Sequence, residues 1–249
     1  MSLVSRIYIR LIRLGFYKNK YAELHFIRQI VEPGNVVMDV GANLGYYSFF
    51  MAKFVGASGK LISVEPIPLF CEVWRKNLRK IPEAQKVLFN CALGTEAKQK
   101  VRMAIPVVDG VVRHGLTRIQ ENPSEKHSEL SFDVEMSTGD VVISEMNIQR
   151  LDFVKCDVEG FERYVIPSLS MAIEKYQPMF QIELSGNENR TEVVDFLTNK
   201  GYSIFLLKHG GLSTIQKSDI FTVDQDFYFI HETQLSTRKN LINSGIDIK

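Results

Sequence analysis

Short apolar runs that alternate with helical patterns constrain this sequence most strongly, from residue 35 onwards. Most runs are unbroken, as in strands buried on both faces of a sheet. The candidate strands are Val36–Val40, Lys60–Glu65, Val87–Cys91, Phe153–Val158, Phe180–Leu184, Ser203–Lys208 and Phe227–His231. Helical patterns separate or precede them at Tyr46–Phe54, Leu69–Lys80, Glu162–Lys175 and Thr191–Lys200. This alternation predicts an α/β fold around a doubly wound, mainly parallel sheet of seven strands.

The segment from Ala97 to Thr138 interrupts this alternation. Two strand-like runs, near Lys100–Ile105 and Leu130–Met136, flank a polar stretch, so we expect an inserted β-hairpin. Its tip at Pro106–Glu129 is long enough to be a functional lid or a disordered excursion. The sequence thus predicts one domain at residues 35–231 that carries an insertion at about residues 97–138.

The two ends of the chain differ from this domain. Residues 1–34 are predicted as a helical extension in which Arg6, Arg10 and Arg13 recur at helical spacing. This basic amphipathic helix either packs on the domain or makes a peripheral membrane contact. No apolar run is long enough to cross a membrane, and no cleavage site follows the first residues, which excludes a signal peptide. Residues 232–249 are predicted as a polar tail.

The composition limits the classes of binding partner and the cellular compartment that we expect. The chain has 249 residues, 45% hydrophobic, with 30 Lys and Arg against 29 Asp and Glu. A net charge of +1 argues against a broad nucleic-acid surface, so we expect no nucleic acid partner. Cys71, Cys91 and Cys156 match neither a zinc pattern nor a disulfide framework. We expect buried, reduced thiols and a cytoplasmic protein.

A glycine-containing turn follows the first predicted strand and opens a helix, with the sequence Asp39-Val40-Gly41-Ala42-Asn43-Leu44-Gly45. Gly41 permits a tight turn, and Gly45 lets the helix approach the strand. Asn43 stands where dinucleotide sites have the glycine that admits a pyrophosphate. The turn therefore favours a cofactor without phosphate, such as S-adenosylmethionine, whose carboxylate can bind the amides at the helix N-terminus.

Polar residues end the next two predicted strands. Glu65 either binds both ribose hydroxyls of a nucleoside or is an exposed carboxylate before a proline turn. Asn90 either contacts the adenine or only supports a turn. The residues that we expect to bind the cofactor are Asp39, Gly41, Asn43, Gly45, Glu65, Asn90 and Asp157.

The densest polar cluster ends the fourth predicted strand, where the sequence reads Lys155-Cys156-Asp157-Val158-Glu159-Gly160-Phe161-Glu162. Strand alternation places Lys155 and Asp157 on one face, and Glu159 as well if the strand continues that far. Glu183 on the fifth strand should lie beside Asp157, because neighbouring strands are about 4.8 Å apart. Such carboxylates can raise one another's pKa, bind a cation or orient a substrate hydroxyl.

Four blocks of this sequence resemble the FkbM-type methyltransferases, namely Val37–Gly45, Val64–Pro66, Phe153–Glu162 and Gln181–Glu183. The resemblance implies a class I, Rossmann-like fold with one antiparallel edge strand, and dependence on S-adenosylmethionine. It also implies, most often, O-methylation of a hydroxyl on a sugar, a glycolipid or a secondary metabolite. The family usually has a Leu-Asp pair before the fourth strand, where this chain has Gly139-Asp140.

The expected activity is therefore methyl transfer to a hydroxyl of a small-molecule or glycan acceptor. A hydroxyl is a poor nucleophile, so we expect Asp157 or Glu159 to act as general base. Lys155 or a bound Mg²⁺ would lower the pKa of the hydroxyl, and Glu183 would complete the catalytic set. The alternatives are a cofactor-binding scaffold without catalysis and a nicotinamide-dependent dehydrogenase, which needs Asn43 to tolerate a pyrophosphate.

Overall fold

The structure is a computed structural model, and it describes residues 18–108, 111–112, 118–119 and 129–243. The basic helix predicted around Arg6, Arg10 and Arg13 lies outside these residues. Most of the predicted hairpin tip, Pro106–Glu129, lies outside them too.

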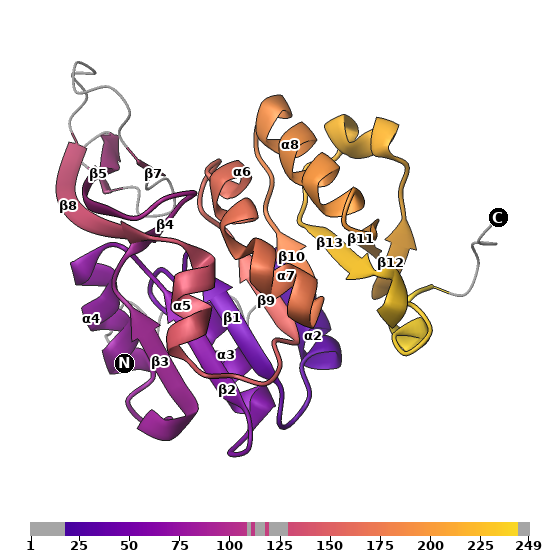
Figure 1. Cartoon of the computed structure of the whole chain (residues 1–249), viewed down its shortest axis with the longest axis horizontal. Helices are drawn as coiled ribbons and strands as arrows, with labels where there is room; N and C mark the ends of the chain where they lie inside the picture. Colours follow the sequence, from indigo (N-terminus) through magenta and orange to yellow (C-terminus); the bar gives the residue numbers. More distant parts are fainter. Residues whose placement is uncertain (1–17, 109–110, 113–117, 120–128, 244–249) are drawn as a thin grey trace.

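An eight-stranded sheet forms the centre of the molecule, in the order β12-β11-β13-β10-β9-β1-β2-β3 (Figure 1). The strands are β1 (Val36–Val40), β2 (Lys60–Val64), β3 (Lys86–Phe89), β9 (Phe153–Cys156), β10 (Met179–Ile182), β11 (Tyr202–Lys208), β12 (Gly211–Thr214) and β13 (Phe227–His231). Neighbours from β3 to β10 pair in parallel, whereas β13 is antiparallel to β10 and to β11. The predicted Rossmann-like α/β fold is confirmed.

Two details of the predicted sheet were wrong. The antiparallel strand β13 lies inside the sheet, between β10 and β11, and not at its edge. The sheet also has an eighth strand, because the chain reverses after β11 through the two-residue turn His209-Gly210. Both turn residues have positive φ, 52° and 81°. This is the backbone that closes a tight hairpin with the twist of its strands, and it creates β12.

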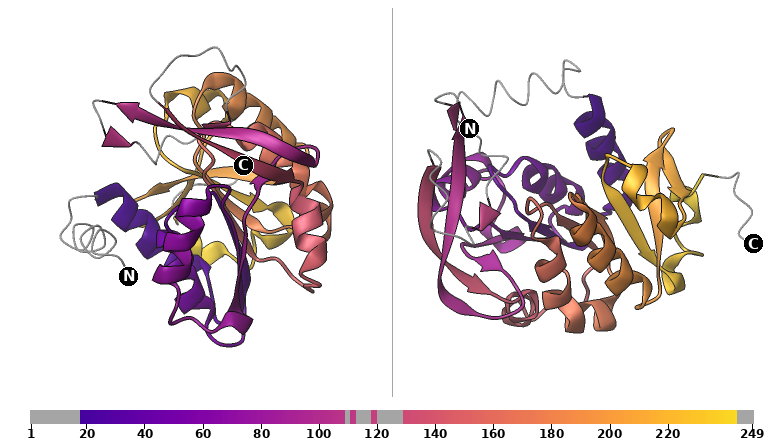
Figure 2. Two further views of the ribbon diagram at one scale, coloured as in Figure 1. Left: turned by 90° about the vertical axis from the view of Figure 1, so that its left-hand side faces the viewer. Right: turned by 90° about the horizontal axis from the view of Figure 1, so that it is seen from above.

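Helices cover both faces of the sheet, as the left view of Figure 2 shows. On one face lie α2 (Lys18–Ile30), α3 (Tyr46–Val55) and α4 (Pro68–Asn77). On the other lie α5 (Gly139–Glu145), α6 (Glu162–Val165), α7 (Ser170–Tyr176) and α8 (Asn187–Thr198). Each layer buries an apolar cluster against the sheet, which is the arrangement that a doubly wound fold requires.

The helix predicted over Glu162–Lys175 is broken in the structure. Pro167 begins a 3₁₀ turn, Pro167–Leu169, between α6 and α7, because proline has no N–H to continue the helical hydrogen bonds. Helix α5 was not predicted. Its residue Asp140 accepts hydrogen bonds from the backbone nitrogens of Met171 and Ala172, at 3.0 and 2.9 Å. Asp140 thereby stabilises the first turn of α7.

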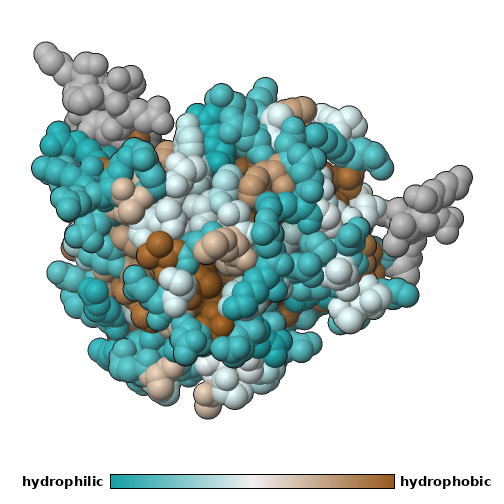
Figure 3. Space-filling view, viewed as in Figure 1, coloured by the Kyte–Doolittle hydropathy of each residue, from teal (hydrophilic) through white to brown (hydrophobic). Residues whose placement is uncertain are grey.

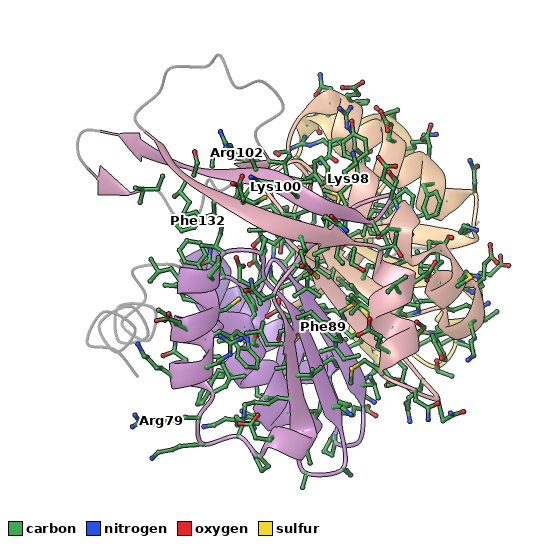
Figure 4. The ribbon with its side chains drawn as sticks, turned by 60° about the vertical axis from the view of Figure 1, so that its left-hand side comes forward. Arg79, Phe89, Lys98, Lys100, Arg102 and Phe132 are labelled. Carbon is green, nitrogen blue, oxygen red and sulfur yellow. The ribbon has the colours of Figure 1, made fainter. Side chains whose placement is uncertain are left out.

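The insertion forms a second sheet beside the β1–β3 end of the main sheet (Figure 2, right). Its strands are β4 (Ala92–Leu93), β5 (Lys98–Val108), β6 (Val111–Val112), β7 (Arg118–Ile119) and β8 (Glu129–Ser137). The predicted antiparallel pair is present as β5 and β8, but β4, β6 and β7 extend it beyond a hairpin. Figure 4 shows Lys98, Lys100 and Arg102 along β5, and Phe132 on β8.

The apolar face of the second sheet packs on the end of the main sheet. Met103 and Met136 are buried in one cluster with Ile67, which follows β2, and Leu44 and Phe161 pack against that cluster. These last two residues lie in the loops after β1 and β9. The insertion therefore covers the turns that the sequence predicts to bind the cofactor.

The segment after β13, expected to be a polar tail, packs on the domain as far as it is described. Leu241 is buried against the α2 face of the sheet. The side-chain amide of Asn243 donates to the carbonyl oxygen of Lys208 at 2.9 Å. Residues 232–243 thus support the β11–β12 hairpin.

The surface in Figure 3 is mainly hydrophilic, with a limited apolar area around α5. One exposed apolar residue there is Val141, which belongs to α5. In the described part of the chain, no helix combines the length and the apolar character that a membrane span requires.

Helix α2 should be essential to stability, because it packs as part of the core. Phe26 is 1% exposed, and its ring meets Tyr228 edge-on at 5.4 Å. We expect Phe26→Ala to lower the free energy of unfolding by about 3 to 5 kcal/mol in urea titrations. Phe221→Ala is the matched control, since Phe221 is 48% exposed, and it should change stability by about 0.5 kcal/mol or less. Equal losses would show that α2 is not part of the core.

Candidate functional site

The loop after β1 and the loop after β9 meet at the point where the strand order of the main sheet changes direction. The chain passes from β1 to β2 on one side and from β9 to β10 on the other. Gly41, at φ 77°, follows β1, and a Cβ atom there would lie 1.9 Å from the carbonyl oxygen of Asp157, which follows β9. Only glycine allows this contact. Open α/β sheets bind ligands at this switch point, beyond the carboxyl ends of the strands.

The turn after β1 is braced from several sides. Asn43 adopts φ 48°, and its backbone nitrogen donates to Oε2 of Glu65 at 2.7 Å. The side chain of Asn77 on α4 donates to the carbonyl oxygen of Leu44 at 2.7 Å. A Cβ atom on Gly45 would lie 2.6 Å from Cδ1 of Trp74. Gly45 therefore lets α3 approach α4, and not the strand as predicted.

Glu65 holds two turns together with one carboxylate. Its Oε2 accepts from Asn43, and its Oε1 accepts from the backbone nitrogen of Ile67 at 2.9 Å. Burial raises the pKa of Glu65 to about 7, although the two backbone hydrogen bonds oppose the rise. Each oxygen has a second lone pair that could accept from a hydroxyl. The alternative of an exposed carboxylate is wrong, since Glu65 is buried.

Asn90 lies beside Glu65, but its amide nitrogen serves the protein. It donates to the carbonyl oxygens of Glu65 and Pro66, at 3.0 and 2.8 Å. These bonds fix the turn after β2, which is the structural alternative weighed for this residue. A contact between Asn90 and adenine stays a prediction.

A row of polar side chains crosses the middle of the main sheet. Ser63, Asp39, Lys155, Gln181 and Tyr228 are successive register partners on β2, β1, β9, β10 and β13. All five are buried. Register partners point to the same face of a sheet, so these groups lie side by side beneath α2 and α3.

Asp39 is buried in this polar row and is not exposed at the turn Gly41–Gly45. Its Oδ2 accepts a hydrogen bond from the Ser48 hydroxyl on α3 at 2.5 Å. Burial raises the pKa of Asp39, while the positive charge of Lys155 opposes the rise. The observed contacts make Asp39 a link between β1 and α3, and its predicted contact with the cofactor stays a prediction.

Lys155 is the central cation of the site. Its Nζ donates to Oδ2 of Asp157 at 2.9 Å and lies 4.5 Å from the centre of the Tyr47 ring. Burial alone would lower the pKa of Lys155, but the carboxylates of Asp157, Asp226 and Asp39 outweigh burial and raise it. Lys155 therefore remains an ammonium group and cannot accept a proton at neutral pH.

A cavity of about 190 Å³ opens beside this ion pair. We call it the first cavity; Tyr47, Lys155, Asp157, Glu183 and Asp226 are among the residues that line it. Asp157 and Glu183 both line this cavity, and their direct juxtaposition stays a prediction. Asp157 therefore lines the first cavity, and its backbone carbonyl approaches Gly41 in the turn after β1.

Glu159 was expected beside Lys155 and Asp157 if the strand continued that far, but the structure does not place it there. Strand β9 ends at Cys156, and Glu159 follows in an exposed turn with φ 56°. It is not among the residues that line the first cavity. The alternation that would have placed Glu159 beside Asp157 stops too early.

The sequence analysis named Glu162 as part of the polar cluster but missed its role. Glu162 is fully buried, and its Oε1 accepts from the backbone nitrogens of Val158 and Gly160, at 2.9 and 3.3 Å. Its Oε2 accepts from the Asn189 amide on α8 at 2.6 Å. Glu162 therefore sets the shape of the loop that carries Asp157 and Glu159.

The described residues do not provide a metal site. No three His, Cys, Asp or Glu side chains among them are grouped as a metal ion would require. One oxygen of Asp157 is already paired with Lys155. The Mg²⁺ predicted between Asp157 and Glu183 thus lacks a matching set of ligands here. The three cysteines are buried and free, as expected.

Comparison with known proteins agrees with this architecture. The family model described as the methyltransferase FkbM domain matches residues 39–204, two-thirds of the chain. The chain belongs to the FkbM methyltransferase family. The match covers the glycine turn, Glu65, the Lys155–Asp157 pair and Glu183, and it leaves out α2 and β13.

Two kinds of relative can be compared with this FkbM family member. The FkbM methyltransferase of Methylobacillus flagellatus KT has the same fold, with a TM-score of 0.50 and 13% identity, over 81% of this chain and 48% of that one. The protein-L-isoaspartate O-methyltransferase of Aeropyrum pernix is 45% identical over 49 residues. That of Caenorhabditis elegans is 34% identical over 59 residues.

The similarity to the protein-L-isoaspartate O-methyltransferases is confined to a short segment. The matched stretch is 20% of this chain and 19% of the Aeropyrum pernix relative, and 24% and 26% for the Caenorhabditis elegans relative. The chain thus spans about a fifth to a quarter of the length of these curated relatives. The comparisons show membership of the FkbM methyltransferase family, and the activity and the methyl acceptor need a separate argument.

The contact between Gly41 and Asp157 predicts a sharp effect of a single methyl group. We expect Gly41→Ala to weaken S-adenosylmethionine binding at least about tenfold, about 1.4 kcal/mol, because the two loops must separate. Asn43→Gly is the control, since Asn43 already has a positive φ that glycine adopts freely. Calorimetry should show near-normal affinity for the control. Normal affinity of Gly41→Ala would place the cofactor elsewhere.

The raised pKa of Glu65 predicts a pH dependence of stability. The folded chain binds a proton at Glu65 with a pKa of about 7, against about 4.5 when exposed. Folding is therefore favoured by protonation, and the free energy of unfolding should fall by on the order of 3 kcal/mol from pH 4.5 to pH 7. Glu65→Gln should remove this decline, whereas Glu72→Gln on the exposed face of α4 should retain it. An unchanged pH slope in Glu65→Gln would contradict the assignment.

Proposed function

We propose that this FkbM family member transfers the methyl group of S-adenosylmethionine to a hydroxyl of a small-molecule or glycan acceptor. One observation carries the proposal. The backbone of Asp157 touches Gly41 in the cofactor turn, while its side chain lines the first cavity. A hydroxyl in that cavity would thus lie between a cofactor and a carboxylate that can accept its proton.

The residues on the β1–β3 side fit a nucleoside with an amino-acid tail. In this proposal Glu65 accepts from ribose hydroxyls, which is supported by its position next to the turn at Gly41–Gly45. That turn opens α3, whose first amides suit a carboxylate. Asn43 occupies the position that a pyrophosphate would need free, which disfavours a dinucleotide. When bound, S-adenosylmethionine supplies a methyl group on a sulfonium that an oxygen nucleophile can attack.

Asp157 is the proposed general base. The acceptor oxygen would take the methyl group that bound S-adenosylmethionine supplies, which would leave the cofactor sulfur as a neutral thioether, and the hydroxyl proton would pass to Asp157. Lys155 remains protonated and holds Asp157 in place, so Lys155 is a positioning residue and not a base. Confinement of the acceptor beside the cofactor would supply much of the rate enhancement.

The other two carboxylates receive different roles. Glu183 lines the first cavity with Asp157 and is proposed to bind an acceptor hydroxyl. Glu159 lies in the exposed turn and is not proposed as the base. No step is assigned to Mg²⁺, because the described residues do not fit it.

The decisive experiment is removal of the charge on Asp157. Asp157→Asn keeps the shape of the side chain but cannot accept the proton, so we expect kcat to fall by about 10² to 10⁴. Affinity for S-adenosylmethionine should change far less, because the backbone of Asp157 is unaltered. The acceptor can be found by mass spectrometry, as a product heavier by CH₂ after incubation with fractionated cell glycans and lipids.

Two controls make the result specific. Glu159→Gln should keep normal kcat, because Glu159 lies outside the first cavity. Turnover should also continue in the presence of EDTA. Normal kcat in Asp157→Asn would exclude Asp157 as the base, and cofactor binding without turnover on any hydroxyl would support a non-catalytic scaffold.

A further inference from the structure

Glu162 is a buried carboxylate to which the proposed reaction assigns no step. Its side chain, at the start of α6, is 0% exposed and is not among the residues that line the first cavity. Removing a carboxylate from water costs free energy unless hydrogen bonds replace the lost water. The hydrogen bonds of Glu162 therefore show what its burial achieves.

Both oxygens of this carboxylate are bound by donors from other parts of the fold. Oε1 accepts from the backbone nitrogens of Val158 and Gly160, at 2.9 and 3.3 Å. Oε2 accepts from the side-chain amide of Asn189 on α8 at 2.6 Å. Burial raises the pKa of Glu162, and these hydrogen bonds oppose the rise because they favour the charged form.

Asn189 is held so that its amide nitrogen faces Glu162. It is buried, and its Oδ1 accepts from the backbone nitrogen of Arg163 at 2.9 Å. An amide whose oxygen is bound in this way turns its nitrogen to the other side, where Asn189 donates to Glu162. The same nitrogen donates to the carbonyl oxygen of Ser185 at 3.2 Å. Asn189 thus joins the loop after β9 to the segment after β10.

The loop that Glu162 binds has a backbone conformation that needs support. Glu159 and Gly160 are consecutive residues in the left-handed region, with φ of 56° and 96°. Glycine adopts this conformation freely, whereas for a glutamate it costs free energy that the surroundings must offset. Glu162 accepts from the backbone nitrogens of Val158 and Gly160, which lie on either side of Glu159, and so stabilises this loop.

The same loop packs against the glycine turn after β1. A Cβ atom on Gly41 would lie 1.9 Å from the carbonyl oxygen of Asp157 and 3.3 Å from Cγ1 of Val158. The side chain of Val158 therefore lies beside Gly41, while its backbone nitrogen donates to Glu162. A displacement of this loop would change the space beside Gly41, where the proposed cofactor binds.

We propose that Glu162 and Asn189 are positioning residues for the cofactor. Together they hold the loop after β9 against the turn after β1, and they thereby set the affinity for S-adenosylmethionine. The inference rests on the proposed function, because it takes the turn after β1 as the cofactor site. Neither side chain is assigned a contact with the cofactor or a step in methyl transfer, so both act through the backbone of the loop between Asp157 and Gly160.

The test reverses the hydrogen bond between the two side chains. In Glu162→Gln, either orientation of the new amide sets its nitrogen against another donor, so the loop must shift. We expect calorimetry to show binding of S-adenosylmethionine at least about tenfold weaker than in the unsubstituted protein. The double variant Glu162→Gln/Asn189→Asp restores one donor and one acceptor, with the charge now in the first turn of α8, where the helix dipole favours it. Its affinity should return to within about threefold of the unsubstituted protein.

A matched control and a second variant separate positioning from stability. Glu192→Gln makes the same chemical change at an exposed residue of α8 and should leave the affinity unchanged. Urea titrations on the same samples establish which variants are folded, since a purely structural role would lower stability and leave the affinity of the folded protein unchanged. If Glu162→Gln does not fold, Asn189→Ala takes its place, and we expect binding at least about threefold weaker.

Each outcome decides the matter. Normal affinity in the folded Glu162→Gln or Asn189→Ala variant, or no recovery in the double variant, would overturn the inference and leave the proposed function standing. Absence of S-adenosylmethionine binding in the folded, unsubstituted protein would overturn the proposed function and this inference with it.

Discussion

The buried ammonium of Lys155 is the interaction on which the rest of the site depends. It sits in the polar row across β2, β1, β9, β10 and β13, with Asp39 as a register partner and Asp157 at hydrogen-bond distance. A buried charge is tolerated only when it is paired, so the strands must keep the register that brings these groups together. A shift of one residue would turn each member of the row to the other face. The chemistry of the site and the register of the sheet therefore constrain each other.

Much of the sheet was predictable because its strands are short apolar runs between turns. β1 and β13 match the predicted bounds in full, and the other predicted strands of the main sheet differ by one or two residues at one or both ends. The glycine turn after β1 and the Lys155–Asp157 pair at the end of β9 were also predictable, since both are local features of the sequence. The order in which the strands pair could not be inferred from local sequence in the same way. The position of β13 inside the sheet depends on contacts between residues far apart in the sequence.

The parts of the site that sequence reasoning missed are long-range. Glu162 carries no local sign that its carboxylate supports the loop before it and contacts α8. Glu159 was misplaced because periodicity cannot show where a strand stops, and here it stops at Cys156. The His209-Gly210 turn lacks the Asn-Gly or Asp-Gly pattern that most strongly signals a tight hairpin. In each case a tertiary contact or a backbone angle decides what the local pattern leaves open.

The two sides of Asp157 are enclosed by different parts of the chain. On the side of the proposed cofactor site, the second sheet packs against Leu44, Ile67 and Phe161. Glu65 joins the turn after β1 to the turn after β2 on this side. On the side of the first cavity, the walls include residues of α2 and of the segment before β13, and the hydrogen bond from Tyr47 to Glu23 at 2.8 Å joins α3 to α2. Tyr47 also covers Lys155. Because Tyr47 lies in the first turn of α3, directly after the turn at Gly41–Gly45, its hydrogen bond to Glu23 connects α2 to that turn, and a change of residues in α2 can affect both the first cavity and the turn.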